Sequence, residues 1–200
     1  EHMDQVPEDI RENMTAIKET SAHLNQLIND LLEIARSESG TVSIAVSPHP
    51  FPPILERVTE GVSSLLQEKS LTLQADVAPL PAVLCDETKL REVLLNLVSN
   101  AIKYNREGGV ITIKAYLNEA RSKMICEVKD TGFGIPKDRQ DRIFQKFFRA
   151  STPGTEGVIG TGLGLFLTRM LVEKMGGKIS FSSVEQEGTT FTFTLPVVPA

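Results

Sequence analysis

The chain has 200 residues, of which 40% are apolar and 24% charged, a composition that argues against disorder, collagen and repeat arrays and supports a sizeable core. A formal net charge of -5 gives no electrostatic reason to expect nucleic acid or an anionic membrane surface as a partner, so an anionic ligand would be held locally. The two distant cysteines, Cys85 and Cys126, favour a reducing and therefore cytoplasmic compartment.

The first predicted element is a long amphipathic helix that begins near Ile10 and ends before Gly40. Its apolar residues follow the spacing of a heptad seam at Ile10, Met14, Ile17, Leu24, Leu27, Ile28, Leu31 and Ala35. Because one helix cannot bury this stripe alone, we predict self-association, with packing against its own domain as the alternative. Residues 1–3 look like a cloning scar, and no apolar run approaches the roughly 18 residues of a membrane span, so we expect a soluble fragment whose full-length protein can be membrane-anchored.

Residues 41–200 form the second predicted unit, in which helices alternate with hairpins. Residues 42–46 are strand-like, and residues 47–53 form a proline-rich connection. The following patterns predict helices at 54–69, 86–105, just after Pro136 and at 162–175, and strands at 71–77, 110–117, 123–129, 178–184 and 189–195. The fold class expected from this order is a two-layer α/β sandwich with a largely antiparallel sheet and helices on one face.

Two asparagines and a lysine lie together on the predicted helix 86–105. At about 100° per residue, Asn96, Asn100 and Lys103 fall to one side of the apolar stripe, with Tyr104 beside them. Asn is a poor residue for a helix interior, so two of them one turn apart suggest a hydrated Mg²⁺ or a phosphate as ligand. Two solvated amides at the border of the helix are the alternative.

Two glycine-rich turns follow. Asp130-Thr-Gly132-Phe-Gly134-Ile135 ends a strand with a carboxylate that could accept a hydrogen bond from a planar ligand, although such turns are also common without a ligand. The segment 160–165 opens a helix and offers backbone N–H groups to phosphate, but its spacing fits neither a dinucleotide fingerprint nor a P-loop. Phenylalanines between the turns precede residues 150–159, which we predict to be a lid.

Taken together and in this order, four segments closely resemble the N, G1, F and G2 boxes of sensor histidine kinases. They are residues 96–104, 130–135, 144–149 and 160–165, and the resemblance extends over about residues 42–196. It implies the Bergerat ATP-binding fold and a site for ATP and Mg²⁺. It implies that Asn100 binds Mg²⁺, with Asn96 beside it. It implies phosphate contacts by Lys103, by Arg149 and by the backbone of Gly160, Thr161, Gly162, Leu163 and Gly164. It also implies an adenine pocket formed by Tyr104, Asp130, Gly132, Gly134, Ile135, Phe144 and Thr189.

The first helix resembles the second helix of the family's dimerisation and histidine-phosphotransfer domain, over residues 27–36. None of His2, His23 and His49 has the sequence setting of the phosphoacceptor histidine. The resemblance therefore implies the catalytic part of a protein-histidine kinase, which phosphorylates the phosphoacceptor helix of its own full-length dimer for onward transfer to a response regulator receiver domain. One alternative is an ATPase of the same superfamily, in which a Glu at the position of Asn96 would act as the general base. The other is a non-catalytic nucleotide-sensing module.

Overall fold

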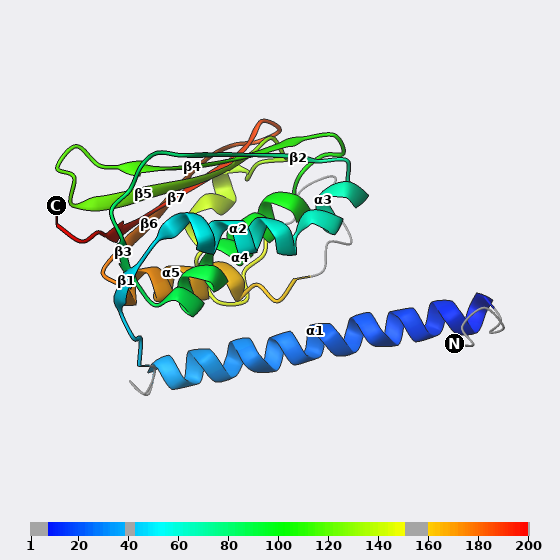
Figure 1. Cartoon of the computed structure of the whole chain (residues 1–200). Helices are drawn as coiled ribbons and strands as arrows, with labels where there is room; N and C mark the ends of the chain where they lie inside the picture. Colours follow the sequence, from blue (N-terminus) through cyan, green and yellow to red (C-terminus); the bar gives the residue numbers. More distant parts are fainter. Residues whose placement is uncertain (1–7, 39–42, 151–159, 200) are drawn as a thin grey trace. The chain divides into compact units, whose positions relative to one another are not determined.

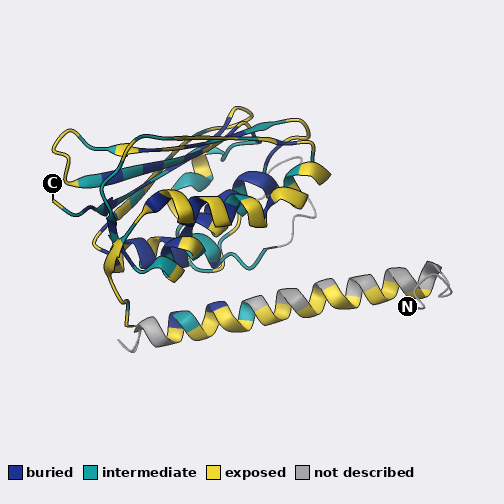
Figure 2. Ribbon diagram, in the orientation of Figure 1, coloured by how far each residue is buried: buried dark blue, intermediate teal, exposed yellow. Residues whose placement is uncertain are grey.

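The computed structural model describes residues 8–38, 43–150 and 160–199, and the chain divides into two compact units, Glu1–Val42 and Ser43–Ala200. The first unit contains one long helix, α1 (Glu8–Glu38). Apolar side chains of the predicted heptad stripe, among them Ile10, Ile17 and Leu24, are exposed on it (Figure 2). No helix in the described ranges is both long and apolar enough to cross a membrane.

The second unit is a mixed five-stranded sheet with helices packed on one face (Figure 1). The strand order is β2-β4-β5-β7-β6, where β2 pairs parallel to β4 and the other neighbours are antiparallel. The strands are β2 (Thr72–Val77), β4 (Val110–Leu117), β5 (Lys123–Asp130), β6 (Lys178–Val184) and β7 (Gly188–Pro196). This arrangement confirms the predicted α/β sandwich.

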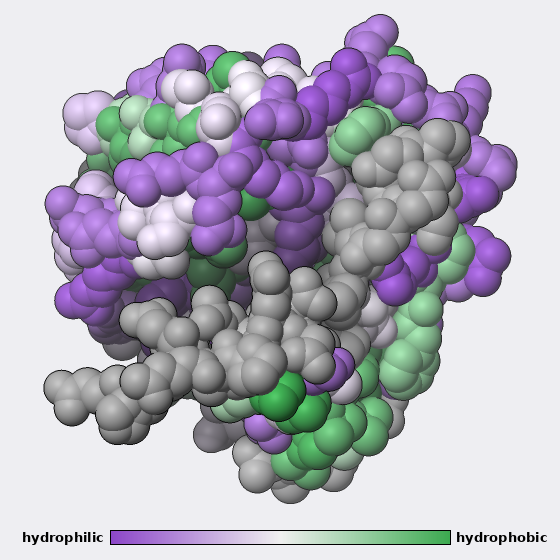
Figure 3. All heavy atoms as spheres, turned by 90° about the vertical axis from the view of Figure 1, so that its right-hand side faces the viewer, coloured by the Kyte–Doolittle hydropathy of each residue, from purple (hydrophilic) through white to green (hydrophobic). Residues whose placement is uncertain are grey.

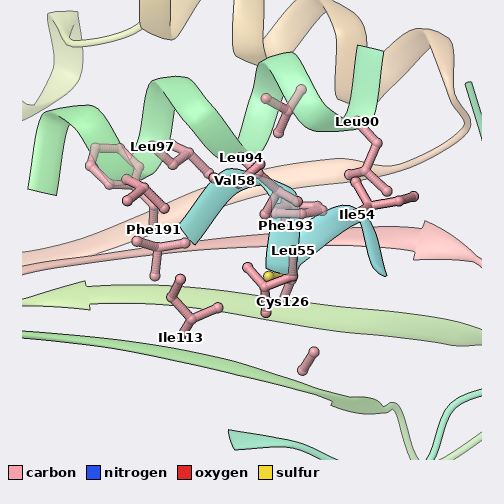
Figure 4. Close-up of a cluster of buried hydrophobic side chains, with 14 of the residues drawn as sticks. Ile54, Leu55, Val58, Leu90, Leu94, Leu97, Ile113, Cys126, Phe191 and Phe193 are labelled. Atoms are coloured by element: carbon pink, nitrogen blue, oxygen red, sulfur yellow. The ribbon is translucent and has the colours of Figure 1, made fainter. Parts of the chain in front are cut away.

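The helices of this unit are α2 (Phe51–Gly61), α3 (Ser63–Glu68), α4 (Glu87–Lys103) and α5 (Gly164–Lys174), with a short 3-10 helix, η2 (Lys137–Arg142). As predicted, Asp86 caps α4: its Oδ1 accepts a hydrogen bond of 3.2 Å from the backbone N–H of Lys89. Figure 4 shows how α2 and α4 place their apolar side chains over the sheet. Leu90, Leu94 and Leu97 of α4 are fully buried there.

The alternation of side chains along each strand explains which face of the sheet the helices cover. Ile111 and Ile113 of β4 are buried, whereas Lys114 and Tyr116 are exposed. On β7, Phe191 and Phe193 are likewise buried and alternate with threonines. On the side of the molecule that Figure 3 shows, many of the coloured residues are hydrophilic. The buried apolar side chains of these strands therefore lie on the face toward the helices.

Three predicted elements differ from the structure. The described residues 43–46 are not a strand; the short strand is β1 (Ser47–His49), which pairs antiparallel with β3 (Val83–Cys85), a strand that the sequence pattern missed. The predicted helix 54–69 is two helices separated at Val62, and the first begins at Phe51 because prolines are well suited to the first helical positions. Most of the predicted lid, residues 151–159, lies outside the described residues.

Candidate functional site

Asp130, the last residue of β5, is a buried carboxylate held by two backbone donors. Its side chain is 6% exposed, and its Oδ1 accepts hydrogen bonds from the N–H groups of Gly132 (2.9 Å) and Thr189 (3.1 Å). Burial raises the pKa of Asp130 from 3.8 to about 6, although the two hydrogen bonds act in the opposite direction. No described residue donates to Oδ2, and no buried side-chain oxygen or nitrogen in the described ranges lacks a partner, so Oδ2 is open to solvent and can accept a ligand's hydrogen bond.

A hydroxyl network extends this arrangement from Asp130 to Ile135. The Thr189 and Ser183 hydroxyl oxygens lie 2.9 Å apart, and Ser183 Oγ accepts a hydrogen bond of 2.8 Å from the backbone N–H of Ile135. Ser183 also donates to the carbonyl of Gly188. The structure thus brings together Asp130, Ile135 and Thr189, which were predicted, through Ser183, which was not. A lone serine on a strand carries no sequence signal of such a role.

The glycines of this turn lie where other segments of the chain approach closely. A Cβ added to Gly132 would overlap the carbonyl oxygen of Tyr104, and one added to Gly134, at φ +64°, would overlap the carbonyl oxygen of Val184. The place of both glycines in the adenine pocket remains a prediction. They allow the end of α4 and the β6–β7 turn to approach the segment 130–135 closely.

Hydrogen bonds fix the same approach on both sides of Phe133. Its N–H donates to the Tyr104 carbonyl (3.1 Å), and its carbonyl accepts from the N–H of Gln186 in the β6–β7 turn (2.7 Å). Arg106 spans the outside, because its Nη2 donates to the Gln186 carbonyl and side chain, and its guanidinium lies 5.6 Å from the centre of the Phe133 ring. The end of α4 is thereby linked to the turn that contains Asp130.

The loop after α4 has a second anchor that the sequence analysis did not identify. Asn105 is 3% exposed, and its Oδ1 accepts hydrogen bonds from the Arg106 N–H (3.0 Å) and the Thr131 hydroxyl (3.3 Å). Lys69 Nζ donates to the carbonyls of Ile102 (3.1 Å) and Lys103 (2.9 Å), which places a cation at the negative end of the helix dipole. These contacts hold the C-terminal turn of α4 in place.

The three residues of the predicted cluster, Asn96, Asn100 and Lys103, all lie on α4 and have different surroundings. Asn96 Nδ2 donates a hydrogen bond of 2.6 Å to the Thr168 hydroxyl on α5. Asn100 is partly buried, and its side chain has no hydrogen-bond partner among the described residues, whereas Lys103 is exposed. The Asn100 amide and the Lys103 ammonium are therefore both available to a ligand.

The N-terminus of α5 adds backbone N–H groups to this region. No side chain caps the helix. Thr161 Oγ1 accepts a hydrogen bond of 3.1 Å from the N–H of Leu163, just before the first turn. Gly162, at φ +71°, packs against the backbone of Phe147, and a Cβ at Gly160 would lie 4.0 Å from the Tyr104 hydroxyl. An uncapped N-terminus at the positive end of the helix dipole is suited to bind phosphate.

Two predicted site residues lie between η2 and α5. Phe144 packs edge-on against the rings of Phe181 (5.9 Å between centres) and Phe191 (6.4 Å), and the Arg169 guanidinium lies 5.8 Å from the centre of its ring. Arg149 is exposed and precedes residues 151–159, which the structure does not describe. Its predicted phosphate contact remains a prediction.

The family model of histidine kinase-, DNA gyrase B- and HSP90-like ATPases matches residues 85–199. The adaptive-response sensory kinase SasA of Crocosphaera subtropica is 39% identical over 175 residues, which are 87% of this chain and 45% of that protein. The sensor protein SrrB of Staphylococcus aureus is 32% identical over 190 residues, which are 95% of this chain and 32% of that protein. The chain thus spans less than half the length of these curated relatives.

Solved structures with the same fold include full-length ShkA in complex with AMPPNP, which has a TM-score of 0.81 at 31% identity and covers 98% of this chain and 41% of that one. The nucleotide-free catalytic domain of histidine kinase ThkA has a TM-score of 0.67 at 27% identity and covers 78% of this chain and 99% of that one. With its buried carboxylate, its uncapped helix and a family match over more than half of its length, the chain belongs to the family of histidine kinase-, DNA gyrase B- and HSP90-like ATPases.

Proposed function

We propose that this chain is the ATP- and Mg²⁺-binding catalytic domain of a sensor histidine kinase and transfers the γ-phosphoryl group of ATP to a histidine of its own full-length dimer. The observation that carries the proposal is Asp130, a buried carboxylate with Oδ1 held by two backbone donors and Oδ2 open to solvent. Sequence similarity to named sensory kinases supports this reaction over others of the family.

Adenine recognition follows from the geometry around Asp130. Oδ2 accepts a hydrogen bond from the 6-amino group of adenine, and the Thr189 hydroxyl, which is 2.9 Å from Ser183, lies next to that carboxylate in the network. Tyr104 flanks the base, because its carbonyl contacts the segment 130–135 and its hydroxyl lies near Gly160. The 6-amino group of adenine is thus the donor in this proposed hydrogen bond, and Asp130 Oδ2, which is held in place by the contacts of Oδ1, is the acceptor.

The phosphates bind between α4 and the N-terminus of α5 in this proposal. Asn100 suits Mg²⁺, because a carboxamide oxygen is a hard ligand and Mg²⁺ takes few protein ligands while it keeps water and phosphate oxygens. No cluster of three or more His, Cys, Asp or Glu in the described ranges competes for the role. Bound Mg²⁺ would neutralise phosphate charge, while Lys103, Arg149 and the N–H groups at residues 160–164 would contact the phosphates.

Phosphoryl transfer to an imidazole requires alignment and charge neutralisation more than covalent chemistry from this domain. In this proposal, Lys103 and the N-terminus of α5 provide positive charge. The proposed transfer does not require a general base on this domain. The superfamily ATPase alternative needs a base one turn before Asn100, where this chain has Asn96 with its amide bound to Thr168. Rapid hydrolysis of ATP is therefore not expected, because loss of a general base costs about 10²- to 10⁴-fold in rate.

The partners of this reaction lie outside the described residues. We assign residues 1–40 to the dimerisation and phosphotransfer domain and residues 41–200 to the catalytic domain. The phosphoryl group then passes to a response regulator receiver domain, in the cytoplasm, where the catalytic part works whether or not the full-length protein is membrane-anchored. The similarity to the sensor protein SrrB covers 95% of the chain and therefore includes most of α1, which supports this assignment.

Nucleotide selectivity tests the proposal. We expect calorimetric titration to show tighter binding of MgATP than of MgITP, whose base lacks the 6-amino group, by about tenfold or more. In Asp130→Asn, the amide oxygen keeps both backbone hydrogen bonds, so the amide nitrogen takes the place of Oδ2 and repels the amino group of adenine. This variant should lose the preference for ATP. Equal binding of ATP and ITP by the wild-type chain would contradict the proposed role of Asp130.

A further inference from the structure

A side-chain contact joins the two helices on which the proposed phosphate site is built. Asn96 of α4 donates to the hydroxyl of Thr168, which is 2% exposed on α5. The same Asn96 amide lies against Gly164, the first residue of α5: a Cβ at 164 would lie 2.5 Å from Asn96 Oδ1 and 3.1 Å from its Cγ. Gly164 and Thr168 are one helical turn apart, so they present one face of α5 to Asn96.

We infer that Asn96 is a positioning residue that sets the N-terminus of α5 against α4, and that Gly164 is a glycine because of the Asn96 side chain. The inference rests on the proposed function, since it assigns the alignment of the phosphate site to this contact. Asn96 acts through α5, and Thr168 is a member of the site that the sequence analysis did not identify.

The backbone of Gly164 gives an independent reason for this assignment. Unlike Gly162, at φ +71°, Gly164 does not have the left-handed conformation that favours glycine. At a helical position with an ordinary backbone, alanine is intrinsically more stable than glycine. The Asn96 amide, which occupies the space of a Cβ, therefore explains the glycine from this structure alone.

The contact determines where the phosphate donors lie relative to the magnesium ligand. Asn100 follows Asn96 by about one turn of α4, and Gly164 begins the uncapped end of α5. If α5 shifts away from Asn96, its N–H groups shift relative to Asn100 and Lys103. Asp130 and Thr189 belong to β5 and β7, so the proposed hydrogen bond from Asp130 to adenine does not depend on this contact.

Substitutions at Thr168 separate positioning from general stability. Thr168→Val removes the hydroxyl with little change in shape, and we expect it to weaken MgATP binding about tenfold, with adenosine binding changed by less than about twofold. Thr168→Ser should restore MgATP binding to within about threefold of wild type. Thr192→Val, on the outward face of β7, is the matched control and should leave both affinities unchanged. Equal weakening of MgATP and adenosine by Thr168→Val would overturn the inference.

A double-mutant cycle tests the link between Asn96 and Gly164 directly. Gly164→Ala should weaken MgATP binding about tenfold in the wild-type background and have little effect in an Asn96→Ala background, which has room for the added methyl group. An equal cost in both backgrounds would overturn the inference. If the wild-type chain bound no nucleotide, the proposed function would fail, whereas the same cycle measured by urea unfolding would still show whether residues 96 and 164 are coupled.

Discussion

Replacement of Asp130 by Asn should stabilise the folded chain while it impairs adenine recognition. Burial raises the pKa of Asp130 from 3.8 to about 6, so ionisation of this carboxyl is less favourable in the folded than in the unfolded chain. The folded state binds more protons than the unfolded state between these values, and wild-type stability therefore falls as the pH rises through this window. The resulting cost is about 2 kcal/mol at pH 5 and about 3 kcal/mol at pH 8, since one pKa unit corresponds to about 1.4 kcal/mol.

Asn at this position cannot ionise, and its Oδ1 can keep the hydrogen bonds from Gly132 and Thr189. Urea unfolding of both proteins at a series of pH values should therefore show a difference in unfolding free energy, Asp130→Asn minus wild type, that grows by about 1 kcal/mol between pH 5 and pH 8. The difference is the informative quantity, because contributions from other titrating groups cancel. A difference that is constant with pH, or that shrinks as the pH rises, would refute the reasoning.

Three further predictions concern packing, positioning and thiol reactivity. Gly132→Ala should reduce the free energy of unfolding by about 2 kcal/mol or more, because the added methyl group would overlap a carbonyl oxygen. Gly61→Ala, where the space around the Cβ is open, should change that free energy by less than about 1 kcal/mol. Equal urea midpoints for the two variants would contradict this prediction. Arg106→Ala should weaken ATP binding about two- to fivefold, as measured by calorimetry, because its contacts to the β6–β7 turn are exposed and so contribute modestly; an unchanged affinity would remove the arginine from the site. Cys85 and Cys126 are buried, and burial raises the pKa of both thiols, that of Cys85 to about 12. Neither thiol should therefore react with a thiol reagent at pH 8 until urea unfolds the chain. Rapid reaction of the native protein would contradict their burial.

Local patterns predicted the elements that carry the site. The apolar stripe of α4, the Asp86 cap and the alternation in β4 and β5 are signals within a few residues, and the structure confirms them. The helix at 54–69 was wrong as one element because its apolar period continues past the break at Val62. β1 and β3 were missed because three-residue strands are too short to show a pattern.

Local sequence patterns could not predict the tertiary contacts that assemble the site. Thr168 lies 72 residues from Asn96, and Ser183 lies 48 residues from Ile135, so neither pair shares a motif. Gly132 belongs to a sequence motif, but the motif does not show that the Tyr104 carbonyl oxygen occupies the space of a side chain there. The motifs thus indicated candidate site residues, whereas the tertiary contacts show what surrounds each of them.

Phosphoryl transfer is the most direct test of the proposed function. The chain would be incubated with γ-labelled MgATP and a dimeric hairpin that carries the phosphoacceptor histidine, and label would be followed into protein and into free phosphate. We predict acid-labile label on the hairpin, none when its histidine is replaced, little free phosphate, and much less transfer with Asp130→Asn. Rapid release of phosphate without labelled protein would contradict the kinase assignment and favour an ATPase, and binding of ATP with neither product would favour a nucleotide-sensing module.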